Sequence, residues 1–409
     1  MVKIKGIFLW LVISAFLISS GPQKNLDIVY LTYTQDPSKS ITVQWHGPAS
    51  QKQSVVSYRK RGDSEWQQSS GSSIKPDKFN LLIHKVHLLS LSSNTFYEFK
   101  IGNAKETHLF RTLPSSLSES PLQFVVAGDA YRSLASFRKT NRQIGKKDPD
   151  FVVVGGDIAY TYSNKVPFKG KEWEIKRWMT FFSEWRSSIV GKGGRMIPIL
   201  PVVGNHDVPK PLVNPNKTSV LLYQLFAFTE DNLSYRAIDV GSYLSLILLD
   251  TNHTYPIQGT QTDWLKGALK ERAAVPYKFA VYHVGAFPSV YDYNAKIPTS
   301  VRNLWCPLFE DSGVQVAFEN HNHAFKRTFP IKQGKIDASG VTYIGDGCWG
   351  VKPRKTVSKA WYLDKKLKKN CFSFVSLSEQ GCDIVSYANT GEVIDIAPHF
   401  TAEPSEAAH

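Results

Sequence analysis

The sequence predicts an α+β protein in which a small β-sandwich is followed by a larger domain of alternating strands and helices. First, short strand-like runs separated by Pro, Gly, Ser and Asn fill residues 26–113, which is typical of a sandwich. Second, from residue 122 onward such runs alternate with amphipathic stretches at 171–190 and 261–274. The Pro- and Ser-rich segment 114–121 is the expected linker.

Within the first part, strands are expected at 41–47, 55–61, 83–91 and 95–102. The stretch from Leu91 to Tyr97 resembles the corner of fibronectin type III-like domains, where a Tyr hydroxyl ties back to the preceding loop. We therefore predict a fibronectin III-like β-sandwich. His84 and His87 have no acidic or sulfur neighbour in the sequence, so we interpret both as structural.

The second part is expected to span residues 122–400. Its alternating strands are expected at 122–129, 150–157, 197–207, 243–250, 277–283, 314–321 and 341–346. Residues 372–396 predict three further strands joined by two glycine-containing turns.

The N-terminus is typical of a secretory signal peptide, expected at residues 1–21. Lys3 and Lys5 precede the apolar run Ile7 to Ile18, and small residues follow it. The run is too short for a comfortable membrane span. We expect a secreted, extracellular protein without a stable membrane span, and an uncleaved membrane tether is the alternative.

Four cysteines in an oxidising compartment predict disulfide bonds. Cys371–Cys382 is the favoured pair, because the residues between them look like two strand segments around a turn. Cys306–Cys348 follows by exclusion, and buried free thiols are the alternative. Three N-x-S/T sequons begin at Asn216, Asn232 and Asn252, which matter only in a eukaryotic host.

The formal net charge is +14, which favours anionic partners such as phosphoesters. A basic surface that only keeps the protein soluble explains the charge equally well. The cluster Lys365, Lys366, Lys368 and Lys369 is too short to indicate a nucleic-acid patch, so we expect no specific nucleic-acid partner.

Polar side chains that bind metals follow five of the expected strands. Ligands of sheets with helical crossovers bind at the carboxyl ends of the strands, so these groups could converge. The residues are Asp129; Asp157 with Tyr160; Asn205 with His206; His283; and His321 with His323.

Their chemistry favours two metal ions. Carboxylate, amide and imidazole groups suit first-row ions, while a Tyr phenolate suits a hard centre such as Fe(III). Two ions about 3.5–4 Å apart can hold the attacking and leaving oxygens of a phosphoryl transfer. Each motif alone is ambiguous, since Gly-Asp is more often a turn. The ordered set favours a metal site.

The order GDAY (128–131), GDIAY (156–160), GNHD (204–207), VYH (281–283) and HNHAFKR (321–327) closely resembles the purple acid phosphatases, within the calcineurin-like metallophosphoesterases. Tyr160 is the specific mark, because many metallophosphoesterases lack this residue. The resemblance covers nearly the whole mature chain. It implies that a four-layer αββα metallophosphoesterase domain follows the sandwich.

The resemblance also implies a role for each residue. Fe(III) would be held by Asp129, Tyr160 and His323, and a divalent Zn, Mn or Fe ion by Asn205, His283 and His321. Asp157 would bridge the two ions. His206 would contact the phosphate, stabilise the transition state and assist the leaving group. The implied reaction is hydrolysis of small-molecule phosphate monoesters by attack of a metal-bound hydroxide on phosphorus.

This chain departs from the family pattern near the site. The family commonly has Gly where Tyr131 and Asn320 stand, and plant-type members carry further His residues in the loop where this chain has Tyr291 and its neighbours. Candidate substrate contacts are therefore Tyr131, Asp292, Tyr293 and Arg327. Packing roles are the alternative, and for Arg327 a salt bridge behind the site is slightly preferred.

We therefore expect a secreted acid phosphatase. One alternative is a secreted phosphodiesterase or nucleotidase with the same dinuclear site, which rates on a monoester and a diester would separate. The other is a catalytically retired cell-surface binding protein, which metal analysis would separate. The oligomeric state is left open.

Overall fold

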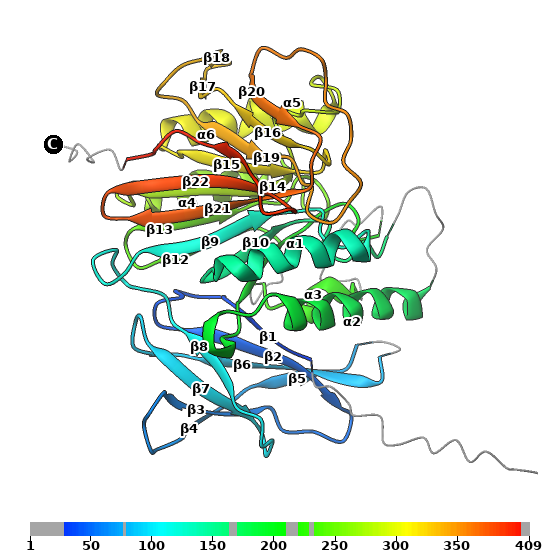
Figure 1. Cartoon of the computed structure of the whole chain (residues 1–409), viewed down its shortest axis with the longest axis vertical. Helices are drawn as coiled ribbons and strands as arrows, with labels where there is room; N and C mark the ends of the chain where they lie inside the picture. The colour runs from blue at the N-terminus through cyan, green and yellow to red at the C-terminus, as the bar shows by residue number, and fades with distance from the viewer. Residues whose placement is uncertain (1–27, 77–78, 163–169, 210–219, 229–232, 402–409) are drawn as a thin grey trace, which may run out of the picture.

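The computed structural model describes residues 28–76, 79–162, 170–209, 220–228 and 233–401 (Figure 1). The expected signal peptide and the sequon residues Asn216 and Asn232 lie outside these residues. Among the helices that are described, none is long and apolar enough to cross a membrane.

The N-terminal part is a sandwich of two four-stranded antiparallel sheets. One sheet has the order β1 (Val29–Thr32), β2 (Ile41–Pro48), β6 (Leu81–Leu88) and β5 (Ser72–Ile74). The other has the order β4 (Gln67–Ser70), β3 (Val55–Lys60), β7 (Phe96–Ile101) and β8 (His108–Arg111).

The sandwich contains the expected tyrosine corner. The Tyr97 hydroxyl accepts a hydrogen bond from the Ser92 amide at 2.9 Å, which confirms the prediction. His84 stacks on the buried ring of Trp45, with 4.6 Å between ring centroids.

Two larger sheets form the second part. The six-stranded sheet has the order β11 (Ile199–Val202), β10 (Phe151–Gly155), β9 (Leu122–Ala127), β21 (Cys371–Ser378), β22 (Gly381–Ala388) and β23 (Val393–Ile396). The seven-stranded sheet has the order β12 (Arg236–Val240), β13 (Leu244–Leu248), β14 (Tyr277–Val284), β15 (Val316–Asn320), β19 (Thr342–Gly345), β16 (Phe325–Thr328) and β20 (Leu363–Leu367). A small hairpin joins β17 (Ile331–Lys332) to β18 (Lys335–Ile336).

The two sheets face each other and helices cover both outer faces (Figure 1), so the expected four-layer αββα fold is confirmed. Apolar side chains between the sheets, such as Phe124 and Phe279, form one continuous core. The outer face of the six-stranded sheet packs against α1 (Leu134–Lys147), α2 (Lys171–Ser188) and α3 (Leu221–Leu225). The other outer face packs against α4 (Thr260–Glu271), α5 (Lys296–Leu304) and α6 (Cys306–Asp311).

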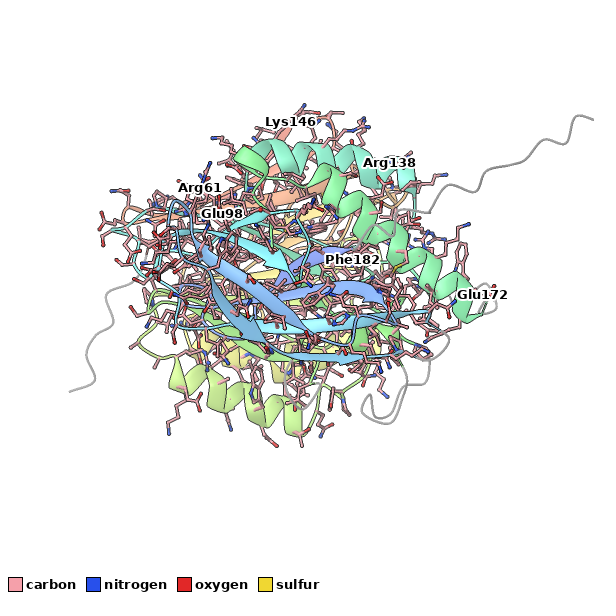
Figure 2. The ribbon with its side chains drawn as sticks, turned by 90° about the horizontal axis from the view of Figure 1, so that it is seen from below. Arg61, Glu98, Arg138, Lys146, Glu172 and Phe182 are labelled. Carbon is pink, nitrogen blue, oxygen red and sulfur yellow. The ribbon has the colours of Figure 1, made fainter. Side chains whose placement is uncertain are left out.

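The sandwich is firmly attached to the helical layer formed by α2 and α3. Tyr30 stacks on Phe182 of α2 with 4.2 Å between ring centroids, and Phe182 lies beside the sandwich strands in Figure 2. The Gln44 amide donates to the Leu225 carbonyl at 3.0 Å and accepts from the Ala227 amide at 3.1 Å. Aromatic stacking and paired polar groups together hold the two parts in one arrangement.

The predicted disulfide bonds are wrong, because all four cysteines are buried free thiols. In the β21–β22 ladder Cys371 lies opposite Ala388, whereas Cys382 lies opposite Leu377. The two cysteines are thus separated by roughly 20 Å along the ladder, beyond the reach of a disulfide. Exclusion therefore gives no support to Cys306–Cys348 either; Cys306 lies on α6 in the outer layer, while the Cys348 carbonyl accepts from the Cys371 amide at 3.0 Å.

Candidate metal centre

The candidate metal-binding side chains meet where strands from both sheets end. Strands β9, β10 and β11 run parallel in one sheet, and β14 and β15 run parallel in the other. Their carboxyl ends therefore lie at one edge of the paired sheets, which is the edge that binds ligands in α/β proteins.

One group of donors joins three side chains that lie far apart in the sequence. The Tyr160 hydroxyl lies 2.7 Å from Asp129 Oδ1 and 3.1 Å from His323 Nε2. His323 Nε2 is in turn 2.9 Å from Asp129 Oδ1. A carboxylate, a phenol and an imidazole thus point at one another, with Asp129 and His323 nearly inaccessible to solvent.

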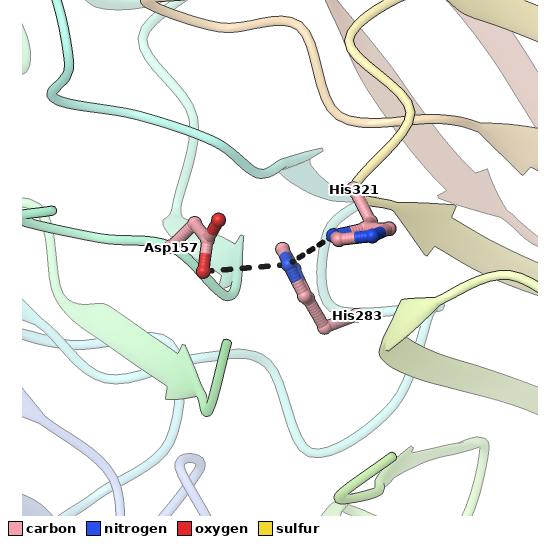
Figure 3. Close-up of side chains that lie close together, drawn as sticks. All are labelled: Asp157, His283 and His321. Carbon is pink, nitrogen blue, oxygen red and sulfur yellow. Dashed lines mark hydrogen bonds and ion pairs between the residues drawn. The ribbon is translucent and has the colours of Figure 1, made fainter. Parts of the chain in front are cut away.

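A second group gathers around His283, the last but one residue of β14 (Figure 3). His283 Nε2 lies 3.3 Å from Asp157 Oδ1, 3.2 Å from His321 Nδ1 and 3.2 Å from Asn205 Oδ1. The other ring nitrogen of His283 is 2.9 Å from the Gly155 carbonyl, which fixes the ring orientation in the way common for metal-binding histidines.

Five of these seven donors have an unusual backbone. Asp129, Asp157, Tyr160, His321 and His323 all have positive φ, between 52° and 78°. Left-handed conformations are costly for residues other than Gly, and they concentrate at functional sites. Gly347 allows this crowding, because a Cβ there would lie 1.9 Å from Asp129 Oδ2.

The donor set fits a pair of metal ions. Ligand atoms of Asp157, His283 and His321 lie within 4.8 Å of one another. Asp157 Oδ2 is fully buried but has no hydrogen-bond partner among the described residues. A buried carboxylate oxygen without a partner is costly, and a bound cation would satisfy it.

Charge interactions within the site alter the pKa values of several groups. Burial acts to raise the pKa of Asp157, but the facing imidazoles, led by His283, outweigh burial and hold it well below its usual range. Burial acts to lower the pKa of His283, but Asp157 raises it to about 10. Burial and the neighbouring His283 lower the pKa of His321. The cluster therefore holds a stable negative charge on Asp157, as a cation site requires.

His206 is held by its neighbours and lines the pocket. Its amide donates to Asp157 Oδ1 at 2.7 Å, and its Nδ1 contacts the Tyr162 carbonyl. Its ring stacks on Tyr160 with 4.7 Å between centroids. Because the Tyr162 carbonyl can only accept, Nδ1 carries a proton, and Nε2 lies 3.9 Å from Asp157 Oδ2.

A pocket of about 1070 Å³ opens above these groups and is lined by Asn205, His206, His321 and His323. Among the candidate substrate contacts, Asp292 lines the pocket. The other three lie elsewhere: Tyr131 packs under the Arg177 guanidinium at 3.6 Å, Tyr293 under Arg302 at 3.5 Å, and Arg327 pairs with Asp395 at 2.7 Å.

Asn320 occupies a space made by two glycines behind the site. Its amide donates to the Tyr282 carbonyl at 2.9 Å. A Cβ at Gly128 would lie 2.4 Å from Asn320 Oδ1, and a Cβ at Gly155 would lie 2.1 Å from Asn320 Nδ2. The Asn side chain thus fills room that the two glycines leave open.

Sequence reasoning missed several residues of the site. His253 lines the pocket and its ring lies 5.5 Å from that of His283. Asp207 accepts from the amides of Ile158 at 2.7 Å and Gly204 at 2.9 Å, and so ties two ligand loops together. Asp207 is the last residue of the GNHD motif and could have been found from it, whereas no motif in the sequence includes His253.

Comparisons with known proteins agree with this geometry. The model of the purple acid phosphatase N-terminal domain matches residues 26–112, and the model of the calcineurin-like phosphoesterases matches residues 122–325. The two matches together cover most of the chain. The second part of the chain is thus a calcineurin-like phosphoesterase domain. Since the N-terminal model precedes it, the chain belongs to the purple acid phosphatase family.

Individual relatives are distant. Probable purple acid phosphatase 20 of Arabidopsis thaliana is 26% identical over 85% of this chain and 84% of its own length. Purple acid phosphatase 15 of Arabidopsis thaliana is 24% identical over 65% of this chain, which matches only 53% of that relative. The solved purple acid phosphatase PPD1 from yellow lupin has a TM-score of 0.74 at 16% identity, covering 90% of this chain and 73% of the lupin chain, which shows the shared fold.

Proposed function

We propose that this protein is a dinuclear-metal acid phosphatase that hydrolyses phosphate monoesters of small molecules. The observation that carries the proposal is the division of the donors into two groups, one around Tyr160 and one around His283. A phenol in the first group favours Fe(III) there, and the imidazoles and amide of the second favour a divalent Zn, Mn or Fe ion.

Asp129, Tyr160 and His323 would hold Fe(III), and Asn205, His283 and His321 would hold the divalent ion. Asp157 would bridge, because Oδ1 lies in the His283 group and Oδ2 has no hydrogen-bond partner among the described residues, with His206 Nε2 3.9 Å away. Bound ions supply positive charge and lower the pKa of water, which generates hydroxide near neutral pH. In its imidazolium form, with a proton on each ring nitrogen, His206 would bind the phosphate through Nε2 and donate a hydrogen bond to the oxygen that develops charge.

We also propose that the protein is secreted. The basic residues, apolar run and small residues at the N-terminus support a signal peptide. Determination of the N-terminal residue of the protein recovered from culture medium would test this, and an uncleaved N-terminus in a membrane fraction would contradict it.

The first experiment is a visible absorption spectrum combined with metal analysis. A phenolate bound to Fe(III) should give a purple or pink band, with two metal ions per chain. Tyr160→Phe should abolish the band. Tyr131→Phe is the matched control, because Tyr131 lies on the adjacent loop but packs against Phe137 and Arg177 instead of the donors.

Other outcomes have distinct meanings. A colourless protein with two Zn or Mn ions would retain a phosphoesterase and exclude Fe(III) at Tyr160. A protein without metal and without phosphoester hydrolysis would contradict the proposal and favour a binding protein. Faster hydrolysis of bis(p-nitrophenyl) phosphate than of p-nitrophenyl phosphate would instead indicate a phosphodiesterase.

A further inference from the structure

The pocket above the donors is lined mainly by basic residues among its charged side chains. Four of its lining residues are cationic, Arg132, Lys296, Lys352 and Arg354, and its one lining Asp or Glu is Asp292. None of the four forms an ion pair with a carboxylate in the described part of the chain. Other arginines do have such partners, for example Arg195 with Asp148 at 2.9 Å.

Two of these cations contact aromatic rings that belong to the donor groups or lie beside them. The Arg354 guanidinium is 5.0 Å from the centroid of Tyr291 and donates to its hydroxyl, and the Tyr291 ring is 5.1 Å from that of His321. The Arg354 amide also donates to the His323 carbonyl at 2.8 Å, which fixes the position of Arg354 beside the metal ligands.

Arg132 lies beside the other donor group, the one that contains Tyr160. Its guanidinium is 5.9 Å from the centroid of Tyr160. The residue follows the Asp129 loop directly, before α1 begins, and its side chain is exposed to solvent. Arg132 and Arg354 thus each lie beside one of the two donor groups, and both line the pocket above them.

The pocket is larger than one phosphate group needs. Its volume of about 1070 Å³ equals that of sites for whole drug-sized ligands. Guanidinium groups bind phosphate oxygens through two parallel charge-assisted hydrogen bonds, and they are the usual choice for recognising this group. Unpaired arginines beside the site therefore fit a second phosphate on the part of the substrate that leaves.

We propose that the preferred substrate carries a second phosphoryl group, which Arg132 and Arg354 bind with help from Lys352. This inference rests on the proposed phosphatase activity and names its substrate class. Water adds to one phosphorus, the P–O bond to the leaving group breaks, and the leaving oxygen takes up a proton. The second phosphate either is linked directly as an anhydride or is separated from the first by a sugar.

The test compares matched substrates that differ by one phosphate. We expect kcat/KM for fructose 1,6-bisphosphate or pyrophosphate to exceed that for fructose 6-phosphate and p-nitrophenyl phosphate at least about tenfold, the effect of one charge-assisted hydrogen bond. Pyrophosphate as the better substrate would identify an anhydride, and the sugar bisphosphate would identify separated phosphates.

Substitutions then assign the preference to the arginines. Arg354→Gln and Arg132→Gln should each lower the ratio of kcat/KM values for two-phosphate and one-phosphate substrates by about tenfold, mainly through KM. Lys355→Gln is the matched control, because Lys355 is exposed on the same segment and does not line the pocket. A merely structural effect would lower both values equally and leave the ratio unchanged.

Failure of the inference differs from failure of the proposed function. A metal-loaded protein that hydrolyses p-nitrophenyl phosphate but shows no preference for two phosphates would overturn the inference alone. The inference alone would also be overturned if both arginine variants kept the preference for substrates with two phosphates. A metal-loaded protein that hydrolyses none of the four substrates would overturn both.

Discussion

At the scale of single residues, the site depends on side chains held in costly conformations. Asp129, Asp157 and Tyr160 have positive φ values, and their oxygens meet other donors at the edge where strands of both sheets end. The candidate ligands could be proposed from sequence, because each lies at or shortly after the end of a strand in a recognisable motif. His253 and Arg354 could not, because the fold brings them to the pocket from segments without such a motif.

His206 provides a test at this scale. We expect His206→Ala to lower kcat for p-nitrophenyl phosphate roughly a hundredfold or more, since a positioned proton donor contributes about that factor. The metal content should stay at two ions per chain, because the His206 ring lies against Tyr160 and is not among the donors. A variant with unchanged kcat, or one that loses its metal, would contradict this role.

At the scale of elements, a buried ion pair supports the loop that follows His283. Lys326 on β16 pairs with Glu319 on β15, and both side chains are completely inaccessible. The Glu319 carboxylate also accepts from the Tyr282 hydroxyl at 2.7 Å and from the Ala286 amide at 2.6 Å. The sequence predicted the strand that holds Glu319, but it predicted neither the strand that holds Lys326 nor the charge pair between the two.

Breaking this pair should be costly. Lys326→Met should lower the free energy of unfolding by about 3–5 kcal/mol, because it leaves the Glu319 charge buried without its partner. The double variant Lys326→Met with Glu319→Gln should recover part of this loss. Chemical denaturation of the single and double variants measures both values, and purely additive losses would show that the two residues act independently.

A second test concerns β2 where it meets α2. Burial, helped by His84, lowers the pKa of His46 to about 3. The unfolded chain binds a proton here below about pH 6.5, whereas the folded protein does not. The free energy of unfolding should therefore fall as the pH drops from about 6.5 to about 3, by up to roughly 1.4 kcal/mol per pH unit.

His46→Phe should flatten this dependence, since Phe keeps the aromatic contacts with Phe79 and Phe182. The measurement is denaturant unfolding across the acid range. His399→Gln, which alters an exposed histidine, is the control. An unchanged slope in His46→Phe would show that His46 does not determine acid stability.

At the scale of the whole molecule, some features could be predicted from the sequence and others could not. The four layers were predictable because the ordered motifs resemble the purple acid phosphatases, whereas the alternation of strands and amphipathic stretches alone indicated only the extent of the second part. The absence of a Cys371–Cys382 disulfide was not predictable, because it depends on strand register. The register places the two cysteines at opposite ends of one ladder. The net charge of +14 is likewise evident from sequence, but the position of four cations around the pocket is not.

This charge predicts a dependence on salt. We expect kcat/KM for an anionic substrate to fall several-fold between about 20 mM and about 500 mM ionic strength, because salt screens the attraction to exposed cations. Arg354→Gln should weaken the dependence. Steady-state kinetics, with the metal content checked at each salt concentration, measures this dependence. A flat profile would show that the cations that line the pocket do not attract the substrate.

The packing of Asn320 against Gly128 and Gly155 also constrains how the sequence can evolve. A side chain at Gly155 would overlap only the Asn320 amide, so it can be accommodated once Asn320 has become smaller. At Gly128 a Cβ would also lie 2.8 Å from the Gly155 carbonyl oxygen, so a smaller residue at 320 does not make room there. We therefore expect substitutions at 155 and 320 to be correlated among relatives, with loss of the Asn side chain first, and Gly128 to be retained whatever stands at 320.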